Sequence, residues 1–166
     1  MKKRLTSMLL AVMMLLGILA GCTEQSTPTE PVAEFPDLET LYHQGIEVLE
    51  QMGSNAPVLF PETDINYMNE FYPGIADIEL KQFFAGVAPV TNAPFEIVLV
   101  EVADKADVPV VLDIYQARAD KESGDSAYPE NAEAWINNCK ITSRGCYVFL
   151  AVLMDPCEVP AEFILD

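Results

Sequence analysis

The sequence predicts a single α+β domain in which a small antiparallel sheet of about four strands is covered by helices. Three observations lead to this fold class. Helical and strand patterns follow one another in the order α, α, β, β, α, α, β, β, α. The run 95–102 (FEIVLVEV) is β-branched, and its middle is apolar on both faces, which indicates a central strand covered on each side. The last two strand patterns flank a short turn, as in a hairpin.

The part of the domain before the sheet predicts two helices. Asp37 suits an N-cap, and apolar residues recur after it at helical spacing until about Gly53. Residues 54–61 contain two prolines and predict a loop. A short helix is expected over 64–71, closed by the Pro-Gly pair that follows it.

The middle of the domain predicts two strands and a longer helix. A weak strand pattern over 81–89 precedes the strong pattern over 95–102. The helix is expected from about Asp107 to Glu122, because Pro109 is tolerated only in the first turn of a helix. One apolar stripe on this helix consists of Val108, Val111, Leu112, Tyr115 and Ala119.

A shorter helix and a hairpin complete the pattern. Pro129 opens a helix over about 130–138, with Trp135 and Ile136 facing inward. The hairpin that follows is expected to have a short strand at 139–142, a turn at 143–145 and a long apolar strand at 146–154. A last helical turn or two is expected over 159–165.

The N-terminus has the features of an export signal. Residues 1–21 combine a basic start, a short apolar stretch and small residues before a cysteine. The ending Leu19-Ala20-Gly21-Cys22 is similar to a bacterial lipobox, which implies that a peptidase cuts before Cys22 and that this cysteine carries a diacylglyceryl anchor. The alternative is an uncleaved membrane helix, although its 17 residues are short for a span of about 20. Both interpretations place the rest of the chain outside the cytoplasmic membrane.

The chain thus divides into three parts. The signal peptide covers 1–21, a lipidated cysteine with a Pro-rich tether covers 22–36, and the α+β extracytoplasmic domain covers 37–166. The formal net charge is −17, and the first 21 residues contain three basic residues and no acidic one. The exported part therefore carries 26 acidic and 6 basic residues. This charge excludes a general nucleic-acid binder, and the 51% hydrophobic content excludes a wholly disordered chain.

The four cysteines permit at most one intrachain disulfide if Cys22 carries a lipid. Cys139 and Cys146 flank the hairpin turn and can face each other if the register of the strands permits it, and the export route permits a disulfide. The alternative is that both are small buried apolar groups. His43 is the single histidine, and no zinc-ligand spacing or nucleophile motif accompanies it. We therefore predict no metal, no cofactor and no catalytic residues.

The acidic surplus makes a cation or ligand contact worth testing. The turn that contains Asp120, Glu122 and Asp125 begins like a calcium loop but has a glycine where a ligand should stand, so a solvated acidic face is the favoured interpretation. Arg118 lies among acidic neighbours near the end of its helix. We interpret it as a structural ion pair, with an anionic ligand as the alternative.

Several landmarks, taken in order and spacing, carry a resemblance to a known family. They are the lipobox, FYPGI at 71–75, FEIV at 95–98, YQAR at 115–118, YP at 128–129 and GCYV at 145–148. Together they resemble bacterial lipoproteins of the domain-of-unknown-function 4358 family, across about residues 38–163. The family's usual Gly-Asn-Tyr-Val has Cys146 in place of Asn. The resemblance implies a one-domain extracytoplasmic lipoprotein and brings no catalytic residues with it.

The sequence therefore predicts a non-catalytic binding module, held on the outer face of the membrane by its N-terminal lipid, with an envelope protein as candidate partner. One alternative is a lipoprotein that binds a small ligand and is associated with transport. Another is an envelope hydrolase that uses two carboxylates, although nothing singles out two of the 26 acidic residues.

Overall fold

A computed structural model describes residues 37–51, 59–88, 95–125 and 127–153 of the chain. The predicted signal peptide, the tether and the expected helical turns at 159–165 lie outside the described residues. No helix in the described ranges is both long and apolar enough to cross a bilayer.

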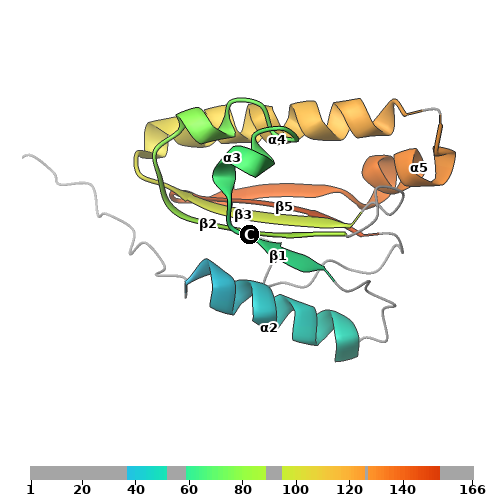
Figure 1. Cartoon of the computed structure of the whole chain (residues 1–166), viewed down its shortest axis with the longest axis horizontal. Coiled ribbons are helices and arrows are strands. Elements are labelled where there is room, and N and C mark those ends of the chain that lie inside the picture. The colour runs from blue at the N-terminus through green and yellow to red at the C-terminus, as the bar shows by residue number, and fades with distance from the viewer. Residues whose placement is uncertain (1–36, 52–58, 89–94, 126, 154–166) are drawn as a thin grey trace, which may run out of the picture. The chain divides into compact units, whose positions relative to one another are not determined.

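The described residues form a five-stranded, fully antiparallel sheet in the order β1-β2-β3-β5-β4 (Figure 1). The predicted α+β class is confirmed, with five strands rather than four. The strong pattern at 95–102 forms the central strand, as predicted. The strands are β1 (Phe60–Glu62), β2 (Leu80–Val87), β3 (Glu96–Val102), β4 (Lys140–Arg144) and β5 (Tyr147–Val152).

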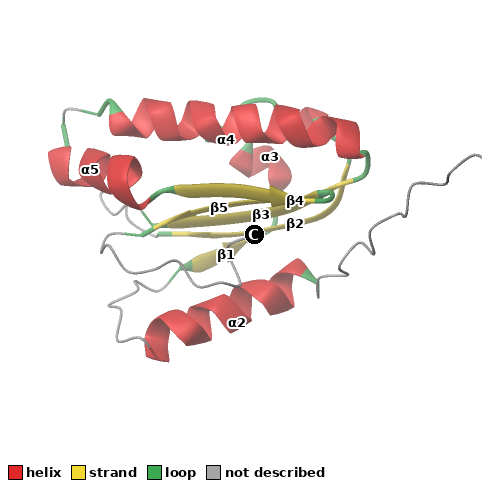
Figure 2. Cartoon of the chain, turned by 180° about the vertical axis from the view of Figure 1, so that it is seen from behind, coloured by secondary structure: helices red, strands yellow, loops and turns green. Residues whose placement is uncertain are grey.

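Helices cover both faces of this sheet. Figures 1 and 2 show α2 (Leu38–Gln51) against one face and α4 (Val108–Ser123) along the other. The helix α5 (Pro129–Asn138) and the short α3 (Ile65–Met68) lie on the same side as α4. Two 3₁₀ turns, η1 (Ile75–Asp77) and η2 (Lys105–Asp107), complete the described elements.

The two core layers follow from the alternation of side chains along the central strands. Ile97 and Leu99 of β3 pack in the layer beneath α2, whereas Val98 and Val100 pack in the layer beneath α4. The six residues of β5 are likewise all buried. A strand covered on both faces has no side that favours polar residues, which is why these strands read as continuous apolar runs.

Local signals set the helix starts where the sequence predicts them. Asp37 caps α2, since its Oδ1 accepts a hydrogen bond from the backbone N–H of Thr40 at 2.9 Å. Hydrogen bonds from the backbone and the hydroxyl of Thr40 lower the pKa of Asp37. The helix α4 begins at Val108, with Pro109 in its first turn, directly after η2.

Two predictions in the loops and edges are wrong. Residues 54–61 were expected to be a loop, but β1 begins at Phe60 and pairs with the end of β2. Pro61 lies opposite Gly86, between the pairs Phe60↔Val87 and Glu62↔Ala85. In an antiparallel ladder the hydrogen-bonded pairs alternate with pairs that form no such bonds, so Pro61 can occupy a position where its missing N–H is not needed.

The second correction concerns the hairpin between β4 and β5. The turn consists of two residues, Gly145 and Cys146, rather than 143–145, because Arg144 pairs with Tyr147. Gly145 has φ 63°, and a glycine at the first turn position supplies this left-handed conformation without strain.

A third correction concerns α5. Trp135 is 4% exposed and faces the core as predicted, but Ile136 is 64% exposed. The next residue along a helix is rotated by about 100°, so the face that buries Trp135 turns Ile136 outward.

Candidate functional site

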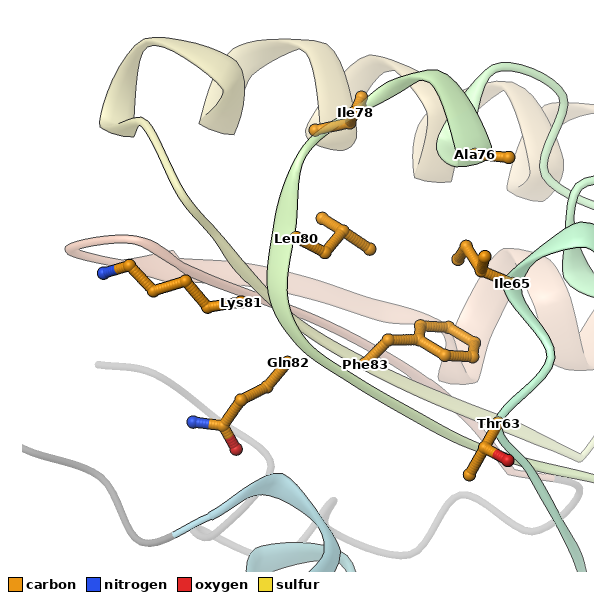
Figure 3. A pocket seen from close by; sticks show the side chains of 8 residues that line it. All are labelled: Thr63, Ile65, Ala76, Ile78, Leu80, Lys81, Gln82 and Phe83. Atoms are coloured by element: carbon orange, nitrogen blue, oxygen red, sulfur yellow. The ribbon is translucent and has the colours of Figure 1, made fainter.

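A pocket of about 370 Å³ lies beside the outer edge of β2. The turn after β1 and the start of α3 form one side, and the chain from η1 into β2 forms the other. Figure 3 shows the side chains of Ile65, Leu80 and Phe83 directed into this space. The lining residues are Thr63, Ile65, Ala76, Ile78, Leu80, Lys81, Gln82 and Phe83.

The two longest polar side chains of the pocket lining serve other contacts. Lys81 and Gln82 extend away from the pocket in Figure 3. The Nζ of Lys81 is 3.3 Å from Oε1 of Glu101, and the Nε2 of Gln82 donates to Oε2 of Glu101 at 2.8 Å. The Oε1 of Gln82 accepts the backbone N–H of Leu38 at 3.0 Å, which joins β2 to the start of α2. The pocket therefore combines an apolar wall, formed by Ile65, Leu80 and Phe83, with a lining that is otherwise partly polar.

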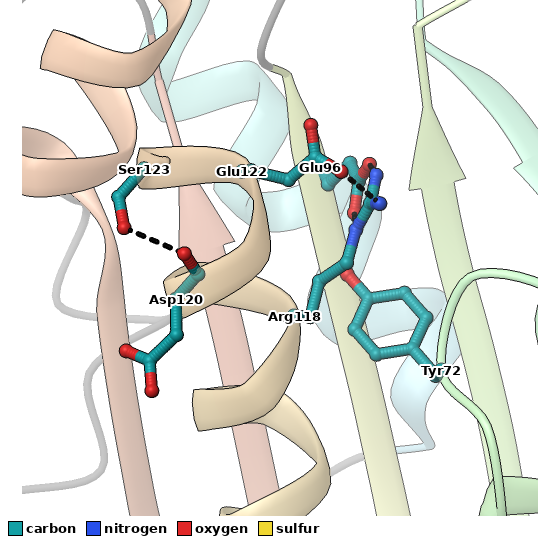
Figure 4. Close-up of polar contacts among 6 residues, drawn as sticks. All are labelled: Tyr72, Glu96, Arg118, Asp120, Glu122 and Ser123. Carbon is teal, nitrogen blue, oxygen red and sulfur yellow. Dashed lines mark hydrogen bonds and ion pairs between the residues drawn. The ribbon is translucent and has the colours of Figure 1, made fainter. Parts of the chain in front are cut away.

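The predicted ion or ligand contact at the end of α4 does not form one cluster. Asp120 accepts a hydrogen bond from Nε2 of Gln116 at 2.7 Å, and Asp125 accepts one from the backbone N–H of Ala127 at 2.7 Å. Figure 4 shows Asp120 directed away from Glu122. In the described ranges, no three side chains of the metal-ligand types converge on a point that could hold an ion.

Arg118 forms the ion pair that the sequence analysis favoured. Its guanidinium donates to both carboxylate oxygens of Glu96, with Nη2 on Oε1 and Nε 3.4 Å from Oε2, and Nη1 lies 2.5 Å from Oε1 of Glu122 (Figure 4). Tyr72 donates its hydroxyl to Oε2 of Glu96 at 2.5 Å. We call these four residues the Arg118 cluster. Its contacts join β3, α4 and the segment after α3.

Aromatic rings enclose the guanidinium of Arg118. Its Cζ lies 5.5 Å from the ring centre of Phe71, 5.8 Å from that of Tyr72 and 5.5 Å from that of Trp135. The side chain of Arg118 is only 9% exposed. Burial alone would lower the pKa of Arg118, but the hydrogen bonds and charge of Glu96 outweigh it and raise this pKa. The arginine is thus a charged group held inside the protein by its own partners.

The same environment acts on the neighbouring phenols and thiol. Burial, followed by the negative charge of Glu96, raises the pKa of Tyr72 well above its usual value. Burial raises the pKa of Tyr115 in the same direction and raises that of Cys139 to about 12. These groups are therefore held neutral in the folded protein at physiological pH.

The disulfide between Cys139 and Cys146 that the sequence left open as one of two possibilities does not form in the structure. Both cysteines are free, and the ladder between β4 and β5 places them at opposite ends of the hairpin. Cys146 lies in the turn, whereas Cys139 precedes Lys140, the strand residue farthest from the turn. The strand between them spans about 17 Å at 3.3–3.4 Å per residue, far beyond the 7 Å limit between the Cα atoms of a disulfide.

His43 is exposed on α2, and its ring meets the edge of Tyr42 at 5.4 Å between ring centres. It lies in the helix on the opposite face of the sheet from the Arg118 cluster. The arrangement does not bring His43 together with the candidate carboxylates.

Two members of the Arg118 cluster, Glu96 and Tyr72, were not predicted as site residues. Glu96 could have been found from the sequence, since it is an acidic residue at the start of a strongly apolar strand and the next helix carries Arg118. Tyr72 could not have been found from the sequence, because its role depends on the turn after α3 that brings its hydroxyl to Glu96.

Comparisons of this chain with models of protein families, with curated proteins and with solved structures find no match. The resemblance to the domain-of-unknown-function 4358 lipoproteins therefore stays a prediction from the sequence.

Proposed function

We propose that this protein is a lipid-anchored binding module on the outer face of the cytoplasmic membrane. The observation that carries the proposal is the lipobox Leu19-Ala20-Gly21-Cys22 at the end of a basic and apolar leader. A lipid with two or more acyl chains on Cys22 gives stable anchoring, at about 0.8 kcal/mol per buried CH₂. The strongly acidic domain adds no electrostatic attraction to anionic headgroups, so the lipid alone holds it there.

The arrangement of the polar groups supports binding rather than catalysis. Arg118, Glu96, Glu122 and Tyr72 satisfy one another in an enclosed network, which is what a structural ion pair requires. The pocket beside β2 has a lining of mixed polar and apolar character and lies on the surface between two chain segments. These features favour a partner that docks over a substrate that is transformed.

The pocket also supports a second candidate function. Its volume of about 370 Å³ falls within the range of about 300–1,000 Å³ that is typical of small-molecule sites. A lipoprotein that binds a small ligand and is associated with transport is therefore the alternative to a protein-binding module.

The anchor is tested by replacing Cys22 with Ala in cells fed with an alkyne analogue of palmitate. We expect the wild-type protein to be labelled and shortened, and Cys22→Ala to stay unlabelled and uncleaved. Cys139→Ala, which changes a cysteine inside the folded domain, is the matched control and should be labelled normally. Normal processing of Cys22→Ala would overturn the lipoprotein proposal.

Crosslinking in intact cells followed by mass spectrometry separates the two candidate functions. A reproducible protein crosslinked to residues that line the pocket supports the interaction module. A small molecule that co-purifies with the protein, without such a crosslink, supports the ligand-binding alternative.

A further inference from the structure

The outer edge of β2 is only partly covered by β1. The pairs between the two strands run from Phe60↔Val87 to Glu62↔Ala85, and the chain then turns away at Thr63 into α3. The stretch of β2 from Leu80 to Phe84 has no strand beside it on this side among the described residues. The pocket occupies this position.

The ladder pattern determines which backbone groups face this edge. The N–H of Ala88 donates to the carbonyl of Phe95, so alternate residues of β2 from Ala88 downward bond to β3. The residues between them, including Ala85 and Phe83, direct their N–H and C=O groups outward. Ala85 finds its partner in Glu62 of β1, but Phe83 has no partner among the described residues. An irregularity in register between Leu80 and Gln82 ends the regular ladder just beyond it.

The part of the β2 edge that β1 leaves uncovered, Leu80 to Phe84, and the pocket form one site. Leu80 and Phe83 contribute both the strand and, through their side chains, the apolar wall of the pocket (Figure 3). An extended segment laid against such an edge gains backbone hydrogen bonds along the strand and places alternate side chains into the neighbouring pocket. The uncovered stretch is about 13 Å long at 3.3 Å per residue, enough for about four residues of the incoming segment.

The charges around the pocket define the occupant. Three exposed carboxylates alternate with lining residues in the chain: Asp64 follows Thr63, and Asp77 and Glu79 flank Ile78. The lysine of the lining points away from the pocket, toward Glu101. These three carboxylates, which we call the acidic rim of the pocket, attract an occupant with positive charge and repel one with negative charge.

We propose that the outer edge of β2 binds an extended basic peptide segment of a partner protein by strand addition, with apolar side chains of that segment entering the pocket. A second copy of this chain is disfavoured as the occupant, because it would bring the same carboxylates against their equivalents. This inference rests on the proposed function, since it names the partner class of the binding module.

The probe is a fluorescent peptide of alternating lysine and valine, added to the full chain purified in detergent. Binding is followed by fluorescence anisotropy. We expect saturable binding, with an alternating glutamate and valine peptide at least about tenfold weaker. A lysine and valine peptide that is N-methylated at every residue, and so lacks backbone donors on both sides of the strand, should also bind at least about tenfold more weakly, because strand addition uses donors on one of those sides.

Charge reversal at the rim gives the matched pair of variants. The double variant Asp77→Lys/Glu79→Lys should weaken binding of the lysine and valine peptide by at least about fivefold. The control Glu130→Lys/Glu133→Lys changes the net charge equally on exposed positions of α5 and should stay within about twofold of wild type. Equal effects of the two double variants would show that only the overall charge attracts the peptide, and would overturn the site.

The backbone amide of Phe83 supplies a direct readout. Its hydrogen exchange, measured by NMR, should slow by at least about tenfold when the peptide is bound, because the outward N–H gains an acceptor. Binding without protection of Phe83, or no binding at millimolar peptide, overturns the proposal. Protection of Phe83 that depends on protein concentration without peptide overturns it in favour of a second copy. None of these results depends on lipidation of Cys22, so failure of the anchor and failure of this site are distinguishable.

Discussion

Replacement of Arg118 by Met removes the charge at the centre of the Arg118 cluster while keeping an unbranched apolar side chain. In the folded protein, Arg118 and Glu96 have side chains that are only 9% and 13% exposed, so water replaces few of their hydrogen bonds. After the substitution, Glu96 keeps the hydroxyl of Tyr72 as a donor but loses its counter-charge. The contacts of the guanidinium with three aromatic rings are lost as well.

The expected magnitude follows from this burial. Removing one partner of a buried ion pair costs about 3–5 kcal/mol. Because Glu96 retains Tyr72 and some exposure, we expect the lower end, a loss of about 3 kcal/mol in the free energy of unfolding for Arg118→Met. Glu122→Gln is the matched control, since Glu122 is 24% exposed and pairs across one helical turn, which predicts a loss of about 0.5 kcal/mol.

A double-mutant cycle isolates the pair itself. The variant Glu96→Gln/Arg118→Met no longer buries an unpaired carboxylate, so its loss should be smaller than the sum of the two single losses by about 1–3 kcal/mol. Urea unfolding at neutral pH measures all four proteins. With a slope of about 2 kcal/mol per molar urea, Arg118→Met should lower the midpoint by about 1.5 M. A shift below about 0.3 M, or additive single losses, would refute the reasoning.

Two further predictions concern packing and pH. Gly86→Ala should lower the free energy of unfolding by about 1–3 kcal/mol, because a Cβ there would lie 2.5 Å from Cε2 of the buried Tyr42 ring. Gly124→Ala, whose Cβ meets its nearest atoms at 3.6 Å, is the control, and equal melting temperatures for the two variants would contradict the argument. Stability should also fall as the pH rises from 9 toward 12, because burial raises the pKa of Cys139 from 9.0 and that of Tyr42 from 10.0, each to about 12. Both groups contribute stability below their unfolded pKa values and lose it as the pH approaches the folded ones. Urea midpoints measured between pH 9 and 12 test this prediction, and the midpoint of a Cys139→Ala variant should fall less over this range than that of wild type. A wild-type midpoint that does not change with pH would contradict the prediction.

Much of the fold was predictable because its signals are local. The β-branched run that forms β3, the cap at Asp37 and the early Pro109 each act within a few residues of themselves. The strand β1 was missed because Phe60–Glu62 is short and contains Pro61, so its strand character depends on pairing with β2 rather than on its own residues.

The candidate sites were predictable only in part. Arg118 could be selected because it lies among acidic neighbours, and its interpretation as an ion pair agrees with its contacts. The partner Glu96 lies 22 residues away in the chain, and the pairing depends on how α4 packs on the sheet. The cysteines show the opposite case, since flanking a turn suggests proximity but the register separates them.

By itself, the sequence determined most of the strands and helices, with β1 as the exception, because apolar periodicity, capping side chains and prolines act on neighbouring backbone. It also determined the acidic character of the chain, which has 26 acidic and 9 basic residues. Only the tertiary structure decided that, among the described residues, β1 covers only part of the outer edge of β2 beside a pocket, and that Glu96 and Tyr72 contact Arg118. These features arise from strand register and helix packing between distant segments, and such contacts leave no periodic pattern in the sequence.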